Sequence, residues 1–220
     1  MLTSPPPLLT VSLCALATTA GWMVMTTPTL GDQAAYFAPE NFNTTVKCLA
    51  GIADGRTVVD DFRAEWYSKV WRAAGEPSLY LQTRDAKPPL RRTYRFSWLR
   101  TFHAPIIVRL EERDGDQYWI SAKRLSGAGG YDPGQVTGKI ERLLTPDETR
   151  RILGVLKSSK AMTAAPAGCD TGLDGSQWIF EGVEDGKLRY ADRWSPKTGP
   201  IHDVGLAFLG LTGWKLDPVY

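Results

Sequence analysis

Histidine is scarce in this 220-residue sequence, since His103 and His202 are the only two. No Cys-x-x-Cys or His-x-x-x-His spacing occurs, so the usual ligand patterns of zinc sites are missing. Neither histidine lies beside a Gly-x-Ser-x-Gly motif, and no phosphate-binding glycine loop is present. From these patterns we predict no metal site, no cofactor and no catalytic residues.

An excess of one charge is also absent. The 26 Lys and Arg residues nearly balance 24 Asp and Glu residues, which gives a net charge of +2. Such a balance supplies no broad attraction to nucleic acid. The run from Arg91 to Arg100 mixes arginines with aromatic residues, as nucleic-acid binders do. Its aromatic residues alternate, however, which is typical of a half-buried strand, and we expect no nucleic-acid partner.

The N-terminal part lacks charged side chains before Asp32 and basic ones before Lys47. Its uncharged run from Leu8 to Met25 approaches the roughly 20 residues that cross a bilayer. We therefore predict that residues 1–25 are a signal peptide or a membrane anchor. A secretory signal normally begins with positive charge, so a wrongly assigned start or a buried apolar arm remains an alternative. The expected location is the periplasm or cell envelope, with membrane contact if the segment is not cleaved.

The remaining sequence predicts one domain. Residues 26–53 show no clear period and are expected to form a tether that partly packs on the domain. Residues 54–220 contain runs of strands interrupted by few helices, which favours an α+β fold. We predict a mainly antiparallel sheet of five or six strands, with about three helices near residues 58–74, 146–158 and 200–212.

Local signals support these helices. In the first helix, Phe62, Trp66, Val70 and Ala73 fall on one face at helical spacing, and Gly75 predicts its end. Tyr67 and Trp71 widen this apolar stripe. The sequence from Thr145 to Glu148 combines an N-cap threonine, a proline and a glutamate, which is typical of a capping box. The glycine-rich residues 127–130 are interpreted as a flexible connection.

Outside the apolar segment, only Cys48 and Cys169 remain. Two distant cysteines in an exported chain predict one long-range disulfide. Two unrelated thiols are the alternative.

The candidate site lies on a predicted hairpin, in which Asp185 and Gly186 form the turn between residues 176–184 and 187–194. This register places Glu181 opposite Tyr190 and diagonal to Asp192, with the two carboxylates about 7–8 Å apart. Carboxylates at that range can act as acid and base. Buried carboxylates also need cations, such as Arg95 or Arg109 on adjacent strands, and we favour this structural role. Both sheet faces of the hairpin carry large apolar groups, so we expect it to lie centrally in the sheet. The ligand-binding candidates are Glu181, Tyr190, Asp192, Arg193 and Trp194.

Several blocks of the sequence resemble a group of uncharacterised proteobacterial proteins. The shared pieces read Leu-Asp-Gly-x-Gln-Trp, Glu-Gly-Val, Asp-Gly and Asp-Arg-Trp-Ser-Pro, and here they fall within residues 172–196. Smaller similar pieces begin at Trp66, Gly75 and Gly129. The resemblance covers about Asp60 to Trp214. It implies a single bacterial domain and carries no activity.

The expected function is a non-catalytic binding or interaction protein of the envelope, whose partner is an unknown protein or envelope ligand. One alternative is an immunity or inhibitor protein against an envelope toxin. A further alternative is an envelope hydrolase that uses Glu181 and Asp192.

Overall fold

The computed structural model describes residues 1, 35–48, 55–216 and 219–220. The predicted signal peptide or anchor at residues 1–25 lies outside the described residues apart from Met1, as does much of the predicted tether at residues 26–53. Within the described part of the chain, no helix has the length and apolar character needed to cross a membrane.

A six-stranded sheet forms the middle of the fold, in the order β6-β5-β4-β3-β7-β8. A small second sheet pairs β1 with β2. In both sheets all described pairs of neighbouring strands are antiparallel, which confirms the α+β class and the mainly antiparallel sheet. The strands are β1 (Thr45–Val46), β2 (Arg56–Thr57), β3 (Thr93–Arg100), β4 (Ile106–Glu112), β5 (Tyr118–Leu125), β6 (Val136–Leu143), β7 (Ser176–Glu184) and β8 (Lys187–Trp194).

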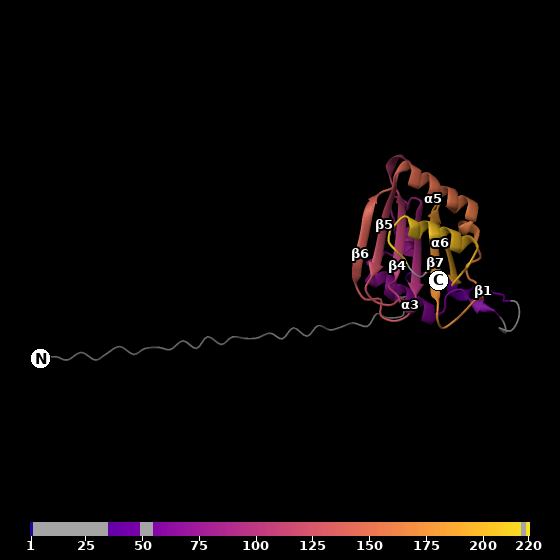
Figure 1. Cartoon of the computed structure of the whole chain (residues 1–220), viewed down its shortest axis with the longest axis horizontal. Helices are drawn as coiled ribbons and strands as arrows, with labels where there is room; N and C mark the ends of the chain where they lie inside the picture. The colour runs from indigo at the N-terminus through magenta and orange to yellow at the C-terminus, as the bar shows by residue number, and fades with distance from the viewer. Residues whose placement is uncertain (2–34, 49–54, 217–218) are drawn as a thin grey trace.

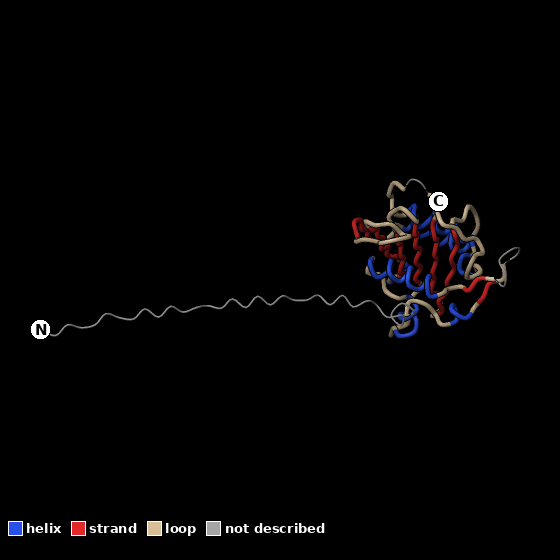
Figure 2. Tube along the Cα trace, turned by 90° about the horizontal axis from the view of Figure 1, so that it is seen from below, coloured by secondary structure: helices blue, strands red, loops and turns tan. Residues whose placement is uncertain are grey.

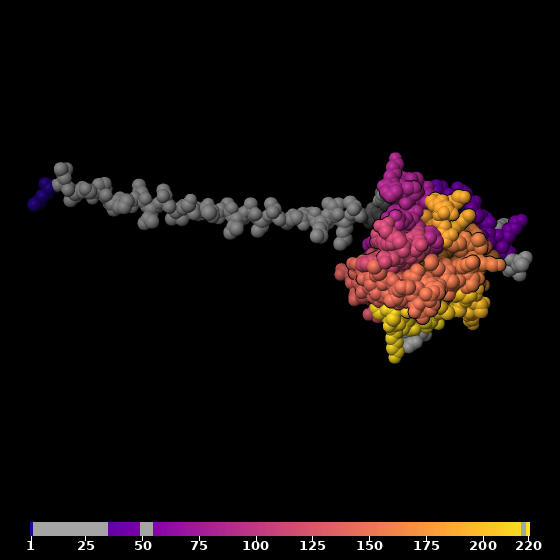
Figure 3. Space-filling model, turned by 90° about the horizontal axis from the view of Figure 1, so that it is seen from above, coloured from indigo at the N-terminus to yellow at the C-terminus, as the bar shows by residue number. Residues whose placement is uncertain are grey.

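Helices cover both faces of this sheet (Figures 1 and 2). The helices α5 and α6 lie on one face and contact each other, whereas α3 lies on the other. Seen from above, α5 forms the middle of the surface and the yellow C-terminal part runs beside it (Figure 3). The three predicted helices are present, and α2 and α4 were not predicted. The helices are α2 (Glu40–Asn43), α3 (Asp61–Ala73), α4 (Leu79–Asp85), α5 (Pro146–Ser159) and α6 (Pro200–Gly210), with short 3-10 turns η1 (Asp114–Asp116) and η2 (Ala161–Thr163).

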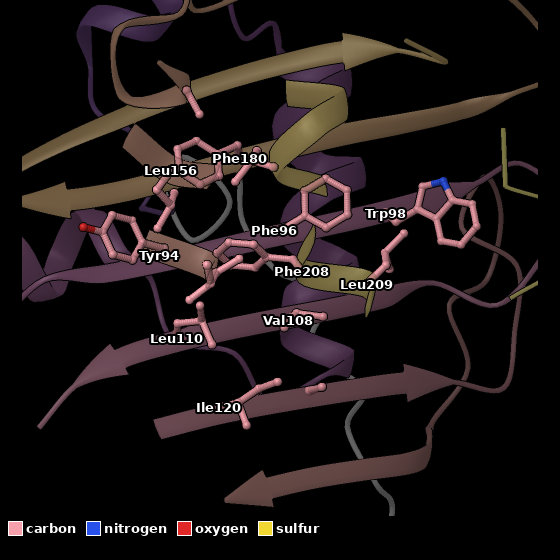
Figure 4. Close-up of a cluster of buried hydrophobic side chains, with 14 of the residues drawn as sticks. Tyr94, Phe96, Trp98, Val108, Leu110, Ile120, Leu156, Phe180, Phe208 and Leu209 are labelled. Carbon is pink, nitrogen blue, oxygen red and sulfur yellow. The ribbon is translucent and has the colours of Figure 1, made fainter. Parts of the chain in front are cut away.

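The core under α5 and α6 is aromatic. Phe96 and Phe180 project from the sheet and meet Phe208 of α6 edge-on (Figure 4). Gly205 lets α6 approach the sheet closely, because a Cβ atom there would lie 2.6 Å from the Trp178 ring. The close packing of α6 on the sheet therefore depends on a glycine at position 205, directly opposite the large side chain of Trp178.

The core under α3 differs from the prediction. The side chains of Ala64, Tyr67, Ser68, Val70 and Trp71 are the buried ones of this helix, and Phe62 is 70% exposed. Val70 is buried and Trp66 and Ala73 pack against this core, so the predicted apolar face was wrong at Phe62. A hydrogen bond helps to orient the Trp71 side of α3 toward the sheet: Trp71 Nε1 donates to Ser97 Oγ of β3 at 2.9 Å. Phe37, from the predicted tether region, is buried in the same core.

The strand β8 is the edge strand of the sheet, so only β7 has the central position predicted for the hairpin. Part of the edge of β8 is covered by residues 166–168. Gly168 N donates to Asp192 O at 3.2 Å, and Asp192 N donates to Pro166 O at 3.0 Å. Such covering reduces the tendency of an edge strand to pair with other chains.

The predicted disulfide is confirmed in this region: Cys48 and Cys169 are bonded, with their Cα atoms 5.6 Å apart. It joins the segment after β1 to the segment that covers β8.

Replacing both cysteines by serine is expected to lower the free energy of unfolding by about 4–5 kcal/mol, since the bond closes a very long loop in the unfolded chain. Denaturant unfolding of the full chain measures this loss. Reducing the wild-type protein should reproduce the loss seen in the double variant. Equal stability of the oxidised and reduced proteins would contradict the prediction.

The predicted capping box is present at the start of α5. Thr145 Oγ1 accepts from Glu148 N, and Glu148 Oε2 accepts from Thr145 N at 2.8 Å. Two bonds from the Arg142 guanidinium, both 2.8 Å, also reach the Glu148 carboxylate. These bonds, those of Arg142 first, lower the pKa of Glu148 from 4.5 to about 2.

Replacing Glu148 with glutamine should therefore give a pH-dependent loss of stability. Because the pKa of Glu148 is lowered in the folded state, its stabilisation is present above pH 4.5 and is lost as the pH falls toward about 2. In thermal unfolding, the gap between wild type and Glu148→Gln should be largest near neutral pH and close under acid conditions. Glu141→Gln, in an exposed pair with Lys139, is the control and should show little gap. A gap that does not change with pH would refute this assignment.

Candidate functional site

The hairpin of β7 and β8 has the predicted register. Glu181 lies opposite Tyr190, and Ile179 lies opposite Asp192. The turn residues Asp185 and Gly186 have φ angles of 49° and 68°, as a two-residue type I′ turn requires. The candidate residues Glu181, Tyr190 and Asp192 therefore share the sheet face that α3 covers.

Asp192 is fully buried and pairs with Arg56 of β2. Arg56 Nη2 lies 2.5 Å from Asp192 Oδ2, and Arg56 Nη1 donates to Gly168 O at 2.9 Å. The hydroxyls of Tyr190 and Tyr67 also donate to Asp192 Oδ2, at 3.2 and 3.4 Å. Burial raises the pKa of Asp192 above its ordinary value, although Arg56 acts in the opposite direction. This cluster attaches β2 and α3 to the edge strand.

Glu181 is also buried and pairs with Arg95 of β3, as predicted, at 2.6 Å. Burial raises the pKa of Glu181, and Arg95 partly offsets this rise. The Arg95 guanidinium also receives support from other groups. It donates to Pro77 O at 2.6 Å and lies 4.4 Å from the centre of the Trp71 ring. Arg95 is therefore held on several sides by α3 and the segment that follows it.

Arg109 does not pair with the candidate carboxylates. Its Nε donates to Glu76 at 2.7 Å, and Lys123 Nζ donates to the other oxygen of Glu76 at 2.7 Å. Arg95 also lies 3.8 Å from Glu76. Polar residues thus cross all six strands on this face in one register row: Tyr190, Glu181, Arg95, Arg109, Ser121 and Glu141.

This arrangement is a structural ion-pair network. Glu181 and Asp192 face cations at hydrogen-bonding distance, and neither lines any of the principal clefts formed by the described residues. The geometry gives both carboxylates a role in holding strands and α3 together, and it offers no route by which a substrate would reach them.

The other two candidate residues lie apart from this network. Arg193 projects to the opposite face, where it donates to Ala165 O at 2.8 Å, and burial lowers its pKa. Trp194 lines a small cleft together with Trp66, Arg56 and Gln177. The volume of this cleft is about 100 Å³, which is below the roughly 300–1,000 Å³ of typical small-molecule sites. The cleft therefore has room for a group about the size of one amino-acid side chain.

Phe62, which lines this cleft, is one of several strongly exposed apolar side chains. Leu173, Phe62, Tyr131 and Phe102 are 91%, 70%, 62% and 56% exposed. Apart from Met1, they are the four most exposed large apolar side chains among the described residues. We call these four residues the aromatic surface.

Specific contacts bring the aromatic surface together from four parts of the chain. The rings of Phe102 and Tyr131 stack with their centres 6.0 Å apart. Trp66, which packs against Phe62, donates its Nε1 hydrogen to Gly129 O beside Tyr131. Thr101 Oγ1, next to Phe102, lies 3.4 Å from Leu173 O. The four members of the aromatic surface therefore lie at the same end of the sheet, with the rings of Phe102 and Tyr131 in direct contact.

The glycine-rich residues 127–130 make this arrangement possible. A Cβ atom on Gly129 would lie 2.7 Å from Arg100 N, so only glycine permits this approach to the end of β3. Gly129 N and Gly130 N donate to His103 O and Thr101 O. Close packing therefore explains these glycines better than the flexible connection that the sequence suggested.

Sequence reasoning missed the aromatic surface. Phe62 was assigned to the core because helical periodicity does not distinguish the two sides of an aromatic-rich helix. Phe102, Tyr131 and Leu173 lie in connections, where no periodic signal exists. The only available signal was the number of large apolar residues outside strands and helices.

Among the described residues, no three His, Cys, Asp or Glu side chains gather in a way that could hold a metal ion. No family model matches the chain, and no curated protein has a significantly similar sequence. The candidate site is therefore argued from its geometry alone.

The Asp192–Arg56 pair is expected to be essential for stability. Asp192→Asn should lower the free energy of unfolding by about 3–5 kcal/mol near neutral pH, because it leaves the buried Arg56 cation unpaired. Arg56→Met combined with Asp192→Asn should recover much of this loss. Denaturant unfolding of both single variants and the double variant gives the coupling energy. A double variant whose loss equals the sum of the single losses would contradict the pairing.

Proposed function

We propose that this chain is a non-catalytic interaction domain of the bacterial cell envelope, which binds a protein partner through the aromatic surface. The observation that carries this proposal is the gathering of its most exposed apolar side chains at one end of the sheet. Large exposed apolar groups in contact with one another mark interaction sites more often than isolated ones do. Aromatic residues are also the commonest energetic anchors of protein interfaces.

The size of the adjoining cleft favours a protein partner over a small ligand. At about 100 Å³, it has room for one anchoring side chain. Trp66 and Trp194 line the cleft as apolar walls, while Arg56 and Gln177 supply hydrogen-bond donors beside them. A flat aromatic rim around one small pocket is a common arrangement for a hot-spot anchor.

Two observations support an envelope location. The uncharged N-terminal run resembles an export signal or an anchor. The Cys48–Cys169 disulfide is of the kind that persists in oxidising compartments. Under this proposal the predicted tether holds the domain close to the membrane, where an envelope partner can reach it.

An immunity or inhibitor protein against an envelope toxin is a specific form of the same proposal, since it also acts by binding. The hydrolase alternative has less support, because Glu181 and Asp192 are occupied by Arg95 and Arg56.

The proposal is tested by photo-crosslinking of the full chain in its own envelope. Replacing both Phe102 and Tyr131 with serine should reduce crosslinking to the principal partner at least tenfold, because anchors of this kind commonly contribute 2 kcal/mol or more, roughly thirtyfold in affinity. Leu206→Ser, on the exposed side of α6, is the matched control and should leave crosslinking unchanged. Equal crosslinking by the wild type and the double serine variant would refute the proposal.

A further inference from the structure

Three buried donors converge on one main-chain oxygen at the start of β7. Trp98 Nε1 and Trp178 Nε1 each lie 3.1 Å from Tyr220 O, and Ser176 Oγ donates to the same oxygen. All three donor side chains are at least 98% buried. Trp98 and Trp178 lie directly opposite in the β3–β7 ladder, so strand pairing itself places their indoles side by side.

The side chain of Tyr220 is also recognised. Its ring meets Trp98 edge-on, with the ring centres 6.4 Å apart. Its hydroxyl lies 2.5 Å from His103 Nδ1. The sheet and the β3–β4 connection thus hold both the main chain and the side chain of this one residue, as a peptide-binding site holds an anchor residue.

A cavity continues from Tyr220 along the same face. It measures about 310 Å³ and is lined by Trp178, Ser195, Lys197 and His202, together with Val219 and Tyr220. This volume lies within the range of ligand sites. Val219, the neighbour of Tyr220, is 44% exposed, so the bound residue is not enclosed by its own segment. Space for an additional part of a ligand is therefore present beside the anchor.

The three donors determine how this site can open. A buried indole N–H or hydroxyl without an acceptor is destabilising. If Tyr220 moved away, Trp98 Nε1 and the Ser176 hydroxyl would lose this acceptor together, whereas Trp178 Nε1 would keep its 2.8 Å hydrogen bond to Ser176 Oγ. Tyr220 can therefore leave most readily when another acceptor oxygen takes its place, so the favoured process is exchange of one ligand for another.

We infer that Trp98, Ser176 and Trp178 form a binding site for an extended peptide that presents a tyrosine, and that Val219 and Tyr220 fill this site in the same chain. The chemistry of the ligand is given by the residue that occupies the site: a main-chain oxygen for the three donors, and a phenol for His103. The inference rests on the proposed function of the chain as a binding domain, but it uses a part of the surface that does not include the aromatic surface.

The test is a titration of the full chain, labelled with ¹⁵N-tryptophan, with the blocked dipeptide acetyl-Val-Tyr-amide. Two forms are compared: the wild type and a variant that lacks Val219 and Tyr220. In the variant, the indole N–H signals of Trp98 and Trp178 should move from their wild-type positions. The dipeptide, added to about 10 mM to detect millimolar binding, should return them toward those positions. The wild type should bind at least about tenfold more weakly, because its own residue occupies the site.

Controls separate specific binding from general effects. Acetyl-Val-Ala-amide should bind much more weakly, and Tyr80→Ala, which removes a half-buried tyrosine of α4, should behave as the wild type. Tyr220→Ala serves as a second open form if the deletion variant does not fold. The inference would be overturned if the indole signals of a folded open form did not respond to acetyl-Val-Tyr-amide. It would also be overturned if they responded equally to both dipeptides. Neither result depends on the crosslinked partner, so failure here is distinct from failure of the proposed function.

Discussion

The side chain of Glu76 is the constraint on which the α3 face of the sheet depends. Its carboxylate lies against Arg95, Arg109 and Lys123, which come from three adjacent strands. Without this carboxylate, the three cations would face a layer of aromatic residues with too few partners, and unpaired buried charge is among the most destabilising features a fold can contain. Together with Glu181, which pairs with Arg95, this one carboxylate therefore allows three basic residues of adjacent strands to lie on the α3 face.

The local sequence fixes Glu76 in that place. Gly75 has a φ of 62° and ends α3 in the left-handed conformation. Glu76 N then donates to Trp71 O at 2.8 Å, and Gly75 N donates to Arg72 O at 2.9 Å, which together form a Schellman motif. The chain therefore turns sharply after the helix and directs Glu76 toward the sheet. The same helix places Trp71 against Ser97 and Arg95, so the helix and its end act together.

The parts of this fold that were predictable from the sequence are those whose signals are local. The hairpin register followed from two turn residues, the start of α5 from four residues, and the end of α3 from Gly75. The α3 face and the partner of Asp192 were not predictable in this way. Arg56 lies 136 residues from Asp192, and no periodicity connects them. Helical spacing likewise could not show that Phe62, on the predicted apolar face, would be exposed while Tyr67 and Trp71, at the edge of that face, would be fully buried.

The candidate site also has one part with a local sequence signal and another part without one. The sequence correctly placed Glu181, Tyr190 and Asp192 on one face, and the pairing of Glu181 with Arg95 was expected from strand neighbours. The aromatic surface was not predictable, because its members come from separate connections that meet only when the sheet is formed. Such connections are positioned by rigid strands and commonly carry the function of a domain.

The start of β7 links the two faces of the sheet. Successive residues of a strand point to opposite faces, so Gln177 lines the cleft beside Trp194, while Ser176 and Trp178 contact Tyr220 on the other face. Three consecutive residues thus contribute to both surfaces that we propose for binding. A shift of β7 by one residue would exchange these side chains between faces and also separate Glu181 from Arg95. The buried ion pair therefore fixes the register on which both surfaces depend, which gives the charged network a role in binding although no ligand touches it.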